Sequence, residues 1–314
     1  MNRSNNKPKV IVILGTTASG KTGLGVKLAD IFAGEIISAD SRQVYRGLDI
    51  GSGKDLPDYS IKTVGGKTKK IKYHLIDVAS PNTEFNLKKY QRLVFKVIPD
   101  ILKRKKLPII VGGTGLYLQA IIDNYHLSDV KPDVKLRAEL ELLDSADLFD
   151  RLSLEHPAFA QKLNDSDKKN KRHLIRYLEV LSGDLSYQAK TKESSYDFLI
   201  LGFDLPKDIL HPRIMKRLND RLDNKDMVGE VRSLHKSGVS WKRLESFGLE
   251  YRYLAFYLQN KMSYDEMKEK LFTAICQFSK RQKSWYRRWE KQGRKINWIN
   301  DFSEAEKLIK KFIK

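Results

Sequence analysis

A glycine-rich segment, GTTASGKT at residues 15–22, constrains the fold more than any other part of the chain. It fits the phosphate-loop pattern G-x-x-x-x-G-K-[ST], with Gly15, Gly20, Lys21 and Thr22 at the fixed positions. The apolar, β-branched run VIVILG precedes it, and KTGLGVKLADIFAG, with apolar residues at helical spacing, follows it. This context favours a strand, a phosphate-binding loop and a helix over a chance match in a polar turn.

The chemistry of such a loop is binding of phosphate oxygens. Its backbone N–H groups point inward, and the start of the following helix adds partial positive charge. Lys21 is expected to reach the terminal phosphates and the Thr22 hydroxyl to ligate Mg²⁺. The loop alone leaves the reaction open, because nucleotides and other diphosphates carry the same oxygens.

Strand and helix patterns alternate along the first part of the chain. Segments 35–40, 73–78 and 107–113 have strand patterns, and 87–106 has a helical pattern. Such alternation predicts an α/β fold with a P-loop parallel-sheet core and helices on both faces. In open sheets of this kind, ligands bind beyond the carboxyl ends of the strands.

The chain changes character twice after this core. A polar, charged segment without strong strand patterns predicts a helical insertion subdomain, after which strand character returns at 198–205. Helical patterns then dominate, with a long patterned stretch from 263 to 293 and an edge strand at 296–300. The expected division is 8–124 for the first part of the core, 125–195 for the insertion, and 196–314 for the core continuation and basic C-terminal helices.

The charge balance favours a polyanionic partner. Lys and Arg number 59 against 39 Asp and Glu, giving a formal charge of +20. Nucleic acid is the first expectation and an anionic membrane surface the second; a basic surface without a partner is the alternative. Cys276 is the single cysteine, which excludes an internal disulfide and suits the cytoplasm. No apolar run reaches 18 residues, and residues 1–9 lack a signal peptide's apolar core, so no membrane span is expected.

Polar residues follow two of the expected strands. SADSRQVY places Asp40 at the end of the second strand, followed by Ser41, Gln43 and Tyr45. A carboxyl group there could ligate a metal or accept a proton as general base; the alternative is an N-cap. LPIIVGG leads into GGTGLY, which places Thr114 at the same edge.

These pieces together resemble the tRNA dimethylallyltransferase, or tRNA isopentenyltransferase, family. The matching segments, in the family's order, are GTTASGKT, IISADSRQVYRGLDIGSGK, HLIDV, LPIIVGGTGLYL, RYLEVLSG, RIMKRLNDRLD and KRQKSWYRRW. The resemblance runs from about residue 10 to 300. It implies transfer of a dimethylallyl group from dimethylallyl diphosphate to the exocyclic amine of the adenosine 3′ of the anticodon in tRNA, with release of pyrophosphate.

The resemblance also implies roles for individual residues. Asp40 matches the proposed base, and Lys21, Thr114 and Arg217 match residues at the diphosphate. Arg213 lies one helical turn from Arg217, although a solvated helix face would also explain both arginines. The expected diphosphate-binding set is Gly15, Thr16, Thr17, Ala18, Ser19, Gly20, Lys21, Thr22 and Arg213. Mg²⁺ at Thr22 would stabilise charge on the leaving pyrophosphate.

The RNA side is expected on three segments. By resemblance, Asp40, Ser41, Arg42 and Gln43 would read the target base. Two basic clusters, at 168–176 and 280–295, would hold the anticodon stem-loop, and interleaved aromatic rings would stack on unpaired bases unless they pack in the core. The cluster residues are Lys171, Arg172, His173, Arg176, Lys280, Arg281, Gln282, Trp285 and Arg287. We expect the chain to act as a monomer.

The sequence departs from the family pattern in three places. Thr16 stands where the family usually has Pro, Ile275 and Cys276 replace a usual Thr-Arg pair, and FGLEY at 247–251 replaces an IGY pattern. The loss of the Thr-Arg pair puts contacts from that turn in doubt.

Two other functions remain open. They are an isopentenyltransferase acting on free adenine nucleotides, and an RNA-associated P-loop NTPase or kinase that binds ATP.

Overall fold

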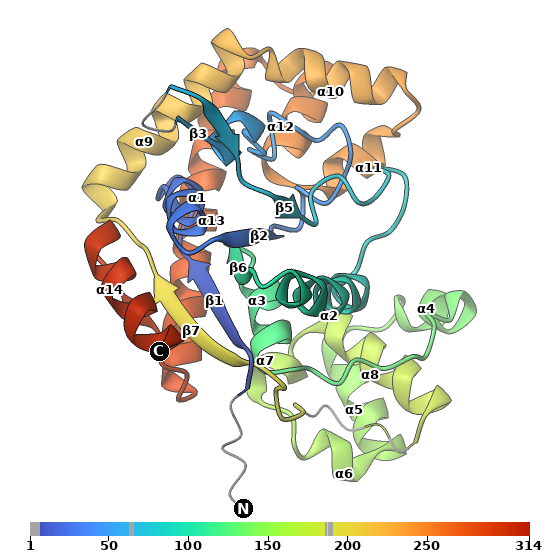
Figure 1. The fold of residues 1–314 in the computed structure, drawn as a ribbon. Helices are drawn as coiled ribbons and strands as arrows, with labels where there is room; N and C mark the ends of the chain where they lie inside the picture. Colours follow the sequence, from blue (N-terminus) through green and yellow to red (C-terminus); the bar gives the residue numbers. More distant parts are fainter. Residues whose placement is uncertain (1–6, 63–65, 186, 188–190) are drawn as a thin grey trace, which may run out of the picture. The chain divides into compact units, whose positions relative to one another are not determined.

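The computed structural model describes residues 7–62, 66–185, 187 and 191–314. Its contacts divide the chain into two compact units. One combines Met1–Ile122 with Ser194–Lys314, and the other is Asp123–Glu193. The first unit contains the sheet, which is traced in Figure 1.

The sheet has six strands in the order β5-β2-β6-β1-β7-β8, and every adjacent pair is parallel. Its strands are β1 (Lys9–Leu14), β2 (Gly34–Ala39), β5 (Tyr73–His74), β6 (Leu107–Gly112), β7 (Asp197–Gly202) and β8 (Asn297–Trp298). The four longer strands are rich in Val, Ile and Leu, as expected of strands covered on both faces. The predicted parallel α/β core is therefore confirmed.

Two predicted strands are shorter than expected. Segment 73–78 keeps only Tyr73–His74 as strand, because Leu75 and Asp77 adopt left-handed backbone angles, with φ of 62° and 57°. Segment 296–300 keeps only Asn297–Trp298, at the edge beside β7. A separate hairpin, β3 (Ser60–Lys62) and β4 (Thr68–Lys70), follows the short 3₁₀ helix η1 (Leu56–Tyr59).

Helices cover both faces of the sheet. Alternate residues of β1 point to opposite faces: Ile11 and Ile13 pack with α1 and α14, whereas Val10 and Val12 pack with α2, α3 and α13. The helices of this unit are α1 (Lys21–Ile31), α2 (Leu87–Lys103), α3 (Gly115–Ile122), α9 (Lys207–Asn219), the π-helical turn η2 (Asp220–Asn224), α10 (Met227–Lys236), α11 (Trp241–Ser246), α12 (Leu249–Leu258), α13 (Tyr264–Lys291) and α14 (Phe302–Ile313).

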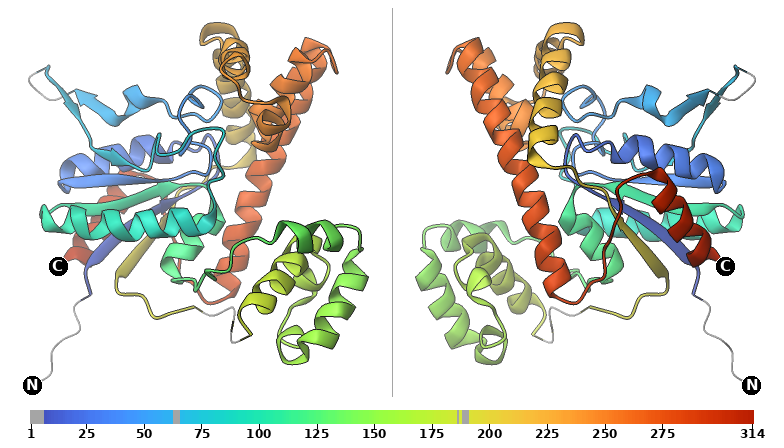
Figure 2. Two further views of the ribbon diagram at one scale, coloured as in Figure 1. Left: turned by 90° about the vertical axis from the view of Figure 1, so that its right-hand side faces the viewer. Right: turned by 90° about the vertical axis from the view of Figure 1, so that its left-hand side faces the viewer.

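The longest helix links two parts of this unit. Figure 2 shows α13 extending from the group of α9 to α12 to the sheet, and it contacts α9, α12 and α3. It begins with a capping box, in which the Ser263 hydroxyl accepts from the Glu266 amide and the Glu266 carboxylate accepts from the Ser263 amide. One helix therefore carries side chains from the helical group to the strand ends.

The second unit is helical. Its helices are α4 (Val134–Leu140), α5 (Ser145–Glu155), α6 (Pro157–Ala160), α7 (Asp165–Lys168) and α8 (Lys171–Gly183). It has its own core, in which leucines of α4, α5 and α8 pack together: Leu140, Leu148, Leu152, Leu174 and Leu178. Such a core is what a small helical domain needs to hold its elements together.

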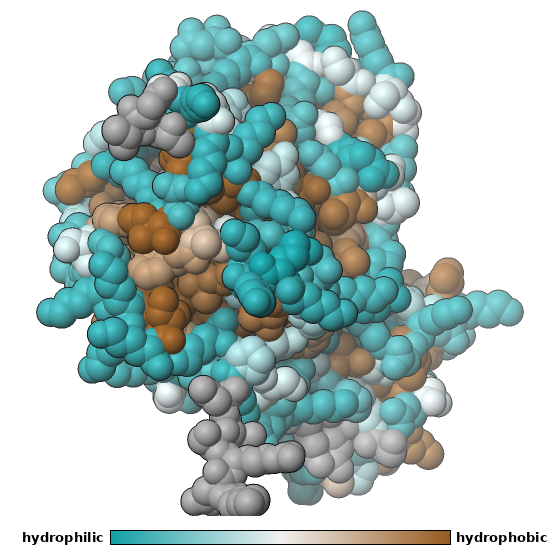
Figure 3. Space-filling view, viewed as in Figure 1, coloured by the Kyte–Doolittle hydropathy of each residue, from teal (hydrophilic) through white to brown (hydrophobic). Residues whose placement is uncertain are grey.

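The face of the molecule shown in Figure 3 is largely polar. Hydrophilic side chains cover most of the face shown in Figure 3, with smaller apolar patches between them. Within the part of the chain that the structure describes, no helix has the length and apolar character needed to cross a bilayer.

Candidate active site

The phosphate loop connects β1 to α1, and two glycines make its path possible. Gly20 has φ of 97°, a backbone angle that is strained for any residue with a side chain. A Cβ on Gly15 would lie 2.1 Å from the Phe203 carbonyl oxygen, which is too close. Helix α1 starts at Lys21, so the free amides of its first turn face the loop. The local geometry is that of a phosphate-binding site.

A cavity of about 300 Å³ lies at the carboxyl ends of the strands. It joins residues from several separate segments of the first unit. Lining residues that we expected at the site are Thr17, Lys21, Thr22, Asp40, Ser41, Arg42, Gln43, Thr114, Arg217, Arg281, Gln282 and Trp285. The strand-end position predicted for the site is therefore where the structure brings these side chains together.

Two cations border the loop. The Lys21 ammonium donates to the Thr16 carbonyl oxygen at 3.1 Å; burial lowers the pKa of Lys21 to about 8, with Asp40 opposing the shift and Arg217 adding to it. The Arg217 Nη2 donates to the Thr17 hydroxyl at 2.5 Å, and burial lowers the pKa of Arg217 to about 10. Both groups lose hydration, and no described carboxylate forms an ion pair with either of them, so the cavity favours an anion.

Asp40 faces the same cavity. Its Oδ1 accepts from the amides of Arg42 at 2.9 Å and Gln43 at 3.4 Å, which caps the turn after β2. The alternative role for Asp40 was the N-cap of a helix. The segment directly after Asp40 is a turn and not a helix, so Asp40 caps a turn. Within the described residues, Oδ2 makes no hydrogen bond, which leaves it able to accept a proton. The neighbouring Thr114 hydroxyl accepts from the Ser41 amide at 3.2 Å and ties the ends of β2 and β6 together.

The Gln43 amide is used inside the protein. Its Oε1 accepts from the Ser38 hydroxyl at 2.8 Å, and its Nε2 donates to the Gly53 carbonyl at 3.0 Å. Gln43 was expected to read the target base. In the structure Gln43 lines the cavity, and its bond to Gly53 also holds the segment Gly51 to Gly53, which lines the cavity too.

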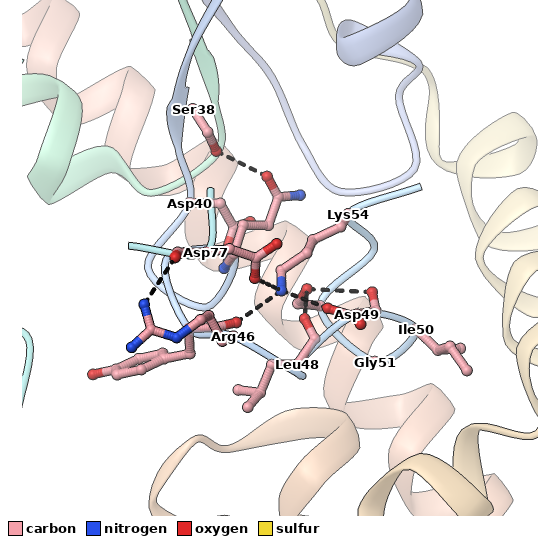
Figure 4. Close-up of polar contacts among 12 residues, drawn as sticks. Ser38, Asp40, Arg46, Leu48, Asp49, Ile50, Gly51, Lys54 and Asp77 are labelled. Carbon is pink, nitrogen blue, oxygen red and sulfur yellow. Dashed lines mark hydrogen bonds and ion pairs between the residues drawn. The ribbon is translucent and has the colours of Figure 1, made fainter. Parts of the chain in front are cut away.

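Sequence reasoning missed Lys54, which fixes the other end of this segment. Lys54 is 1% exposed, and its ammonium donates to the Tyr45 carbonyl at 2.7 Å and contacts the carboxylates of Asp49 and Asp77 (Figure 4). A buried ammonium needs such partners. The available signal was a lysine directly after a glycine-rich turn with acids on both sides.

Helix α13 forms a wall of the cavity and also anchors the loop. The Gln282 side chain was expected on the RNA-facing surface but is buried, because its Oε1 accepts from the Thr17 amide and its Nε2 donates to the Gly113 carbonyl, each at 2.8 Å. One turn later, the Tyr286 hydroxyl donates to the Gly15 carbonyl at 3.1 Å. Tyr286 and Trp289 are core residues, so only Trp285 of the three aromatic side chains lines the cavity.

Six of the nine residues assigned to the diphosphate do not line the cavity. The Thr16 hydroxyl points away from the cavity and donates to Asp204 at 2.9 Å, and Ser19 is fully buried outside it. Arg213 is exposed and does not line the cavity. Arg221, one turn after Arg217, lines the cavity instead. Gly15, Ala18 and Gly20 do not line the cavity either.

The two basic clusters differ in how far their charges are engaged. In the helical unit, Arg176 pairs with Glu179 at 3.2 Å, His173 contacts Asp167 at 2.8 Å, and Lys171 donates to the Glu141 carbonyl, whereas Arg172 is exposed. On α13 the exposed cations of the 280–295 cluster are Lys280, Arg281, Arg287, Arg288 and Lys291. The α13 cations are therefore the freer set.

The two residues that stand in place of the family's Thr-Arg pair have different surroundings. Ile275, 3% exposed, adds an apolar surface to the cavity, and Cys276 lies outside it. Other apolar lining residues are Leu116, Leu249, Phe278 and Trp285. Among the described residues, no group of three or more His, Cys, Asp or Glu could hold a metal. A Mg²⁺ ion would therefore depend on Thr22 and on oxygens supplied by a bound diphosphate.

Comparisons with known proteins agree with this geometry. A family model described as IPP transferase matches residues 43–289. The chain is 42% identical to tRNA dimethylallyltransferase 1 of Syntrophus aciditrophicus, covering 96% of this chain and 97% of that protein. It is 43% identical to tRNA dimethylallyltransferase 2 of Treponema denticola, covering 94% and 96%.

Solved structures give the same result. A tRNA isopentenylpyrophosphate transferase from Bacillus halodurans superposes with a TM-score of 0.67 at 31% identity, covering 98% of this chain and 96% of that one. A eukaryotic dimethylallyltransferase acting on tRNA has a TM-score of 0.70 at 26% identity, covering 88% and 69%. The chain therefore belongs to the IPP transferase family.

Proposed function

We propose that this protein transfers a dimethylallyl group from dimethylallyl diphosphate to the exocyclic amine of the adenosine 3′ of the anticodon in tRNA. The observation that carries the proposal is one cavity that combines a phosphate loop, a carboxylate and an apolar wall. The relatives and neighbours named above are enzymes of tRNA prenyl transfer. They support this function, and they support neither a free-nucleotide acceptor nor an ATP-driven kinase or NTPase.

The donor's diphosphate would lie at the phosphate loop. Lys21, Arg217 and the amides at the start of α1 would bind its oxygens, since no described residue gives these groups a close anionic partner. The short prenyl tail would contact the apolar residues of the same cavity. As the bond between carbon and diphosphate breaks, charge builds on the leaving oxygens, and preorganised cations stabilise that charge.

The acceptor would reach the cavity as a base flipped out of the RNA. Its exocyclic nitrogen forms a bond to the first carbon of the prenyl group, the bond from that carbon to the diphosphate oxygen breaks, and one nitrogen-bound proton passes to Asp40. Asp40 suits this role because its Oδ1 is held by two amides and Oδ2 is free to accept. General-base assistance is worth roughly 10²- to 10⁴-fold.

Magnesium fits this site only in combination with the donor. Thr22 lines the cavity, and the Mg²⁺ ion typically keeps water and binds substrate phosphates along with few protein ligands. We propose that Thr22 and the diphosphate would hold Mg²⁺, which would neutralise charge on the leaving pyrophosphate. Lys21 and Arg217 perform the same task from the protein side.

The RNA would contact the exposed cations of α13. Arg281 both lines the cavity and is exposed, so it marks a route from the cavity to the surface. Lys280 and Arg287 add positive charge on the same helix, which suits an anticodon stem-loop. We propose that the protein acts as a monomer in the cytoplasm, where its tRNA acceptor is found.

The test is product analysis. The wild-type protein is incubated with Mg²⁺, dimethylallyl diphosphate and unmodified tRNA, and digested nucleosides are analysed by mass. We expect a dimethylallyl adduct on one adenosine per tRNA, located 3′ of the anticodon. An adduct on free AMP but not on tRNA would favour the free-nucleotide enzyme, and phosphate release from ATP without any adduct would favour an NTPase.

A further inference from the structure

An arginine that motif reasoning passed over lies in the wall of the cavity. Arg221 is on the π-helical turn η2, one turn beyond Arg217. Its side chain is 4% exposed, and it lines the same cavity as Lys21 and Arg217. Single π-helical turns inside α-helical segments occur frequently at functional sites.

The Arg221 guanidinium is buried but poorly paired. Its Nη2 donates a long hydrogen bond to Asp55 Oδ2 at 3.5 Å, and its Nη1 lies 3.6 Å from Glu250 Oε1. Both distances exceed that of a typical charge-assisted hydrogen bond. Each carboxylate has a closer partner, Lys225 at 3.1 Å and Arg42 at 2.8 Å. The Nε of Arg221 is buried and has no hydrogen-bond partner among the described residues. The guanidinium therefore has donors to spare.

The surroundings concentrate positive charge at this point. Burial is the main cause of the lowered pKa of Arg217, and the positive charge of Arg221 is the next largest. The two guanidiniums therefore lie close enough to repel each other. The chain also makes room for Arg221, because a Cβ on Gly53 would lie 2.1 Å from its Nη2. Buried like charges without close counter-ions are costly unless a ligand compensates them.

We propose that Arg221 binds the diphosphate of the prenyl donor together with Lys21 and Arg217. This inference rests on the proposed function, and it adds a residue that neither the loop motif nor the arginine at position 217 implies. The reason is the combination of a buried guanidinium, unused donors and a shared cavity wall. Bound diphosphate oxygens would supply the anionic partner that Asp55 and Glu250 supply only at a distance.

Inorganic pyrophosphate is a suitable probe, because it carries the same linked phosphates as the donor. Its Kd is measured by calorimetry, with Mg²⁺ present, for wild type, Arg221→Met and the control Lys225→Met. Lys225 shares Asp55 with Arg221 but is exposed and outside the cavity. We expect Arg221→Met to raise the Kd about ten-fold or more, as loss of a charge-assisted contact does, and Lys225→Met to leave it within about three-fold. Equal Kd values in wild type and Arg221→Met would overturn the proposal.

A purely structural role for Arg221 predicts a different pattern. In that case Arg221→Met lowers the melting temperature, yet pyrophosphate still raises that temperature as much as it does in wild type. We expect instead that the pyrophosphate-induced rise is smaller in Arg221→Met and partly restored in Arg221→Lys, which keeps the charge. A full-sized rise in Arg221→Met would contradict the inference even if the variant is less stable.

Transfer to tRNA by the wild-type protein is assayed in parallel, which separates the inference from the proposed function. If wild type transfers the prenyl group but Arg221→Met binds pyrophosphate normally, only the Arg221 proposal fails. If Arg221→Met loses pyrophosphate affinity while wild type makes no tRNA adduct, the anion contact stands and the proposed function fails. Loss of tRNA affinity with unchanged pyrophosphate affinity would assign Arg221 to RNA and overturn the inference.

Discussion

At the scale of single residues, the site depends on charges held out of water. Lys21 and Arg217 are buried beside the loop, and burial lowers the pKa of each. Asp40 keeps its orientation through two backbone amides rather than through a cation. Both features prepare the cavity for a charged donor before it binds, so no reorganisation is needed during the reaction.

Lys21→Ala is expected to separate donor binding from RNA binding. The substitution removes one charge-assisted contact to a compact anion, which costs about 1.5–3 kcal/mol of donor affinity. RNA charge is spread over many phosphates, so the Kd for tRNA changes little. Donor and tRNA affinities are measured side by side. A large loss of tRNA affinity would show that RNA passes over the loop.

Donor affinity is also expected to depend on pH through Lys21. Its pKa of about 8 means that the ammonium is present below pH 8 and lost as the pH rises above it. The diphosphate binds the ammonium, so the donor Kd rises above pH 8 by at most about ten-fold per pH unit. Lys21→Ala is the control, since its Kd lacks this rise. The same rise in Lys21→Ala would assign the titration to another group.

At the scale of elements, local sequence patterns could not predict where helix α13 packs. Strand and helix periodicity predicted the sheet, the loop after β1 and the position of Asp40 and Thr114. The same patterns put Gln282 on an RNA-facing surface, because a basic helix with interleaved aromatic residues is typical of RNA binding. Its true position follows from the packing of α13 against the strand ends, which joins residues 265 positions apart.

The arginines illustrate the same limit. The helical pattern placed Arg213 and Arg217 on one face, and it gave no reason to prefer the turn before Arg217 over the turn after it. The π-helical turn and the close approach of Gly53 place Arg221 in the cavity, and neither has a local sequence signal. Lys54 follows a glycine-rich turn with acids on both sides, but its partners at Asp77 and Tyr45 come together only in the fold.

Gln282→Leu tests the anchoring role of α13. The change leaves the Thr17 amide and the Gly113 carbonyl without their partner, so we expect a loss of about 1–3 kcal/mol in unfolding free energy and weaker donor binding. Chemical denaturation measures the first and calorimetry the second. Ser284→Ala, on the exposed side of the same helix, should change stability by less than about 0.5 kcal/mol. Wild-type stability in Gln282→Leu would show that these bonds contribute nothing.

At the scale of the whole molecule, the charge of +20 is the feature that the cavity alone does not explain. Much of the basic cluster in the helical unit is paired internally, through Glu179 and Asp167. The exposed cations of α13 are therefore the main candidates for binding RNA phosphates. Such contacts release counter-ions and make affinity depend on salt.

We expect the tRNA Kd to rise at least about ten-fold between 50 and 200 mM salt. In Arg281→Gln/Arg287→Gln, the slope of log Kd against log salt concentration should fall by about 1–2, because each phosphate contact contributes roughly 0.7–0.9. Lys307→Gln/Lys311→Gln on α14 removes the same charge elsewhere and should change the slope less. Equal effects of the two double variants would indicate a general field rather than an α13 surface.

The central claim is that one cavity holds the donor at the loop while Asp40 accepts the acceptor's proton. Single-turnover transfer by Asp40→Asn tests it most directly, because Asn keeps an oxygen for the amides of Arg42 and Gln43 but cannot serve as the base. The account predicts a rate at least about 10²-fold below wild type, with tRNA affinity retained and with normal transfer in the control Asp197→Asn, which is exposed at the start of β7. A near-wild-type rate in Asp40→Asn would contradict the account.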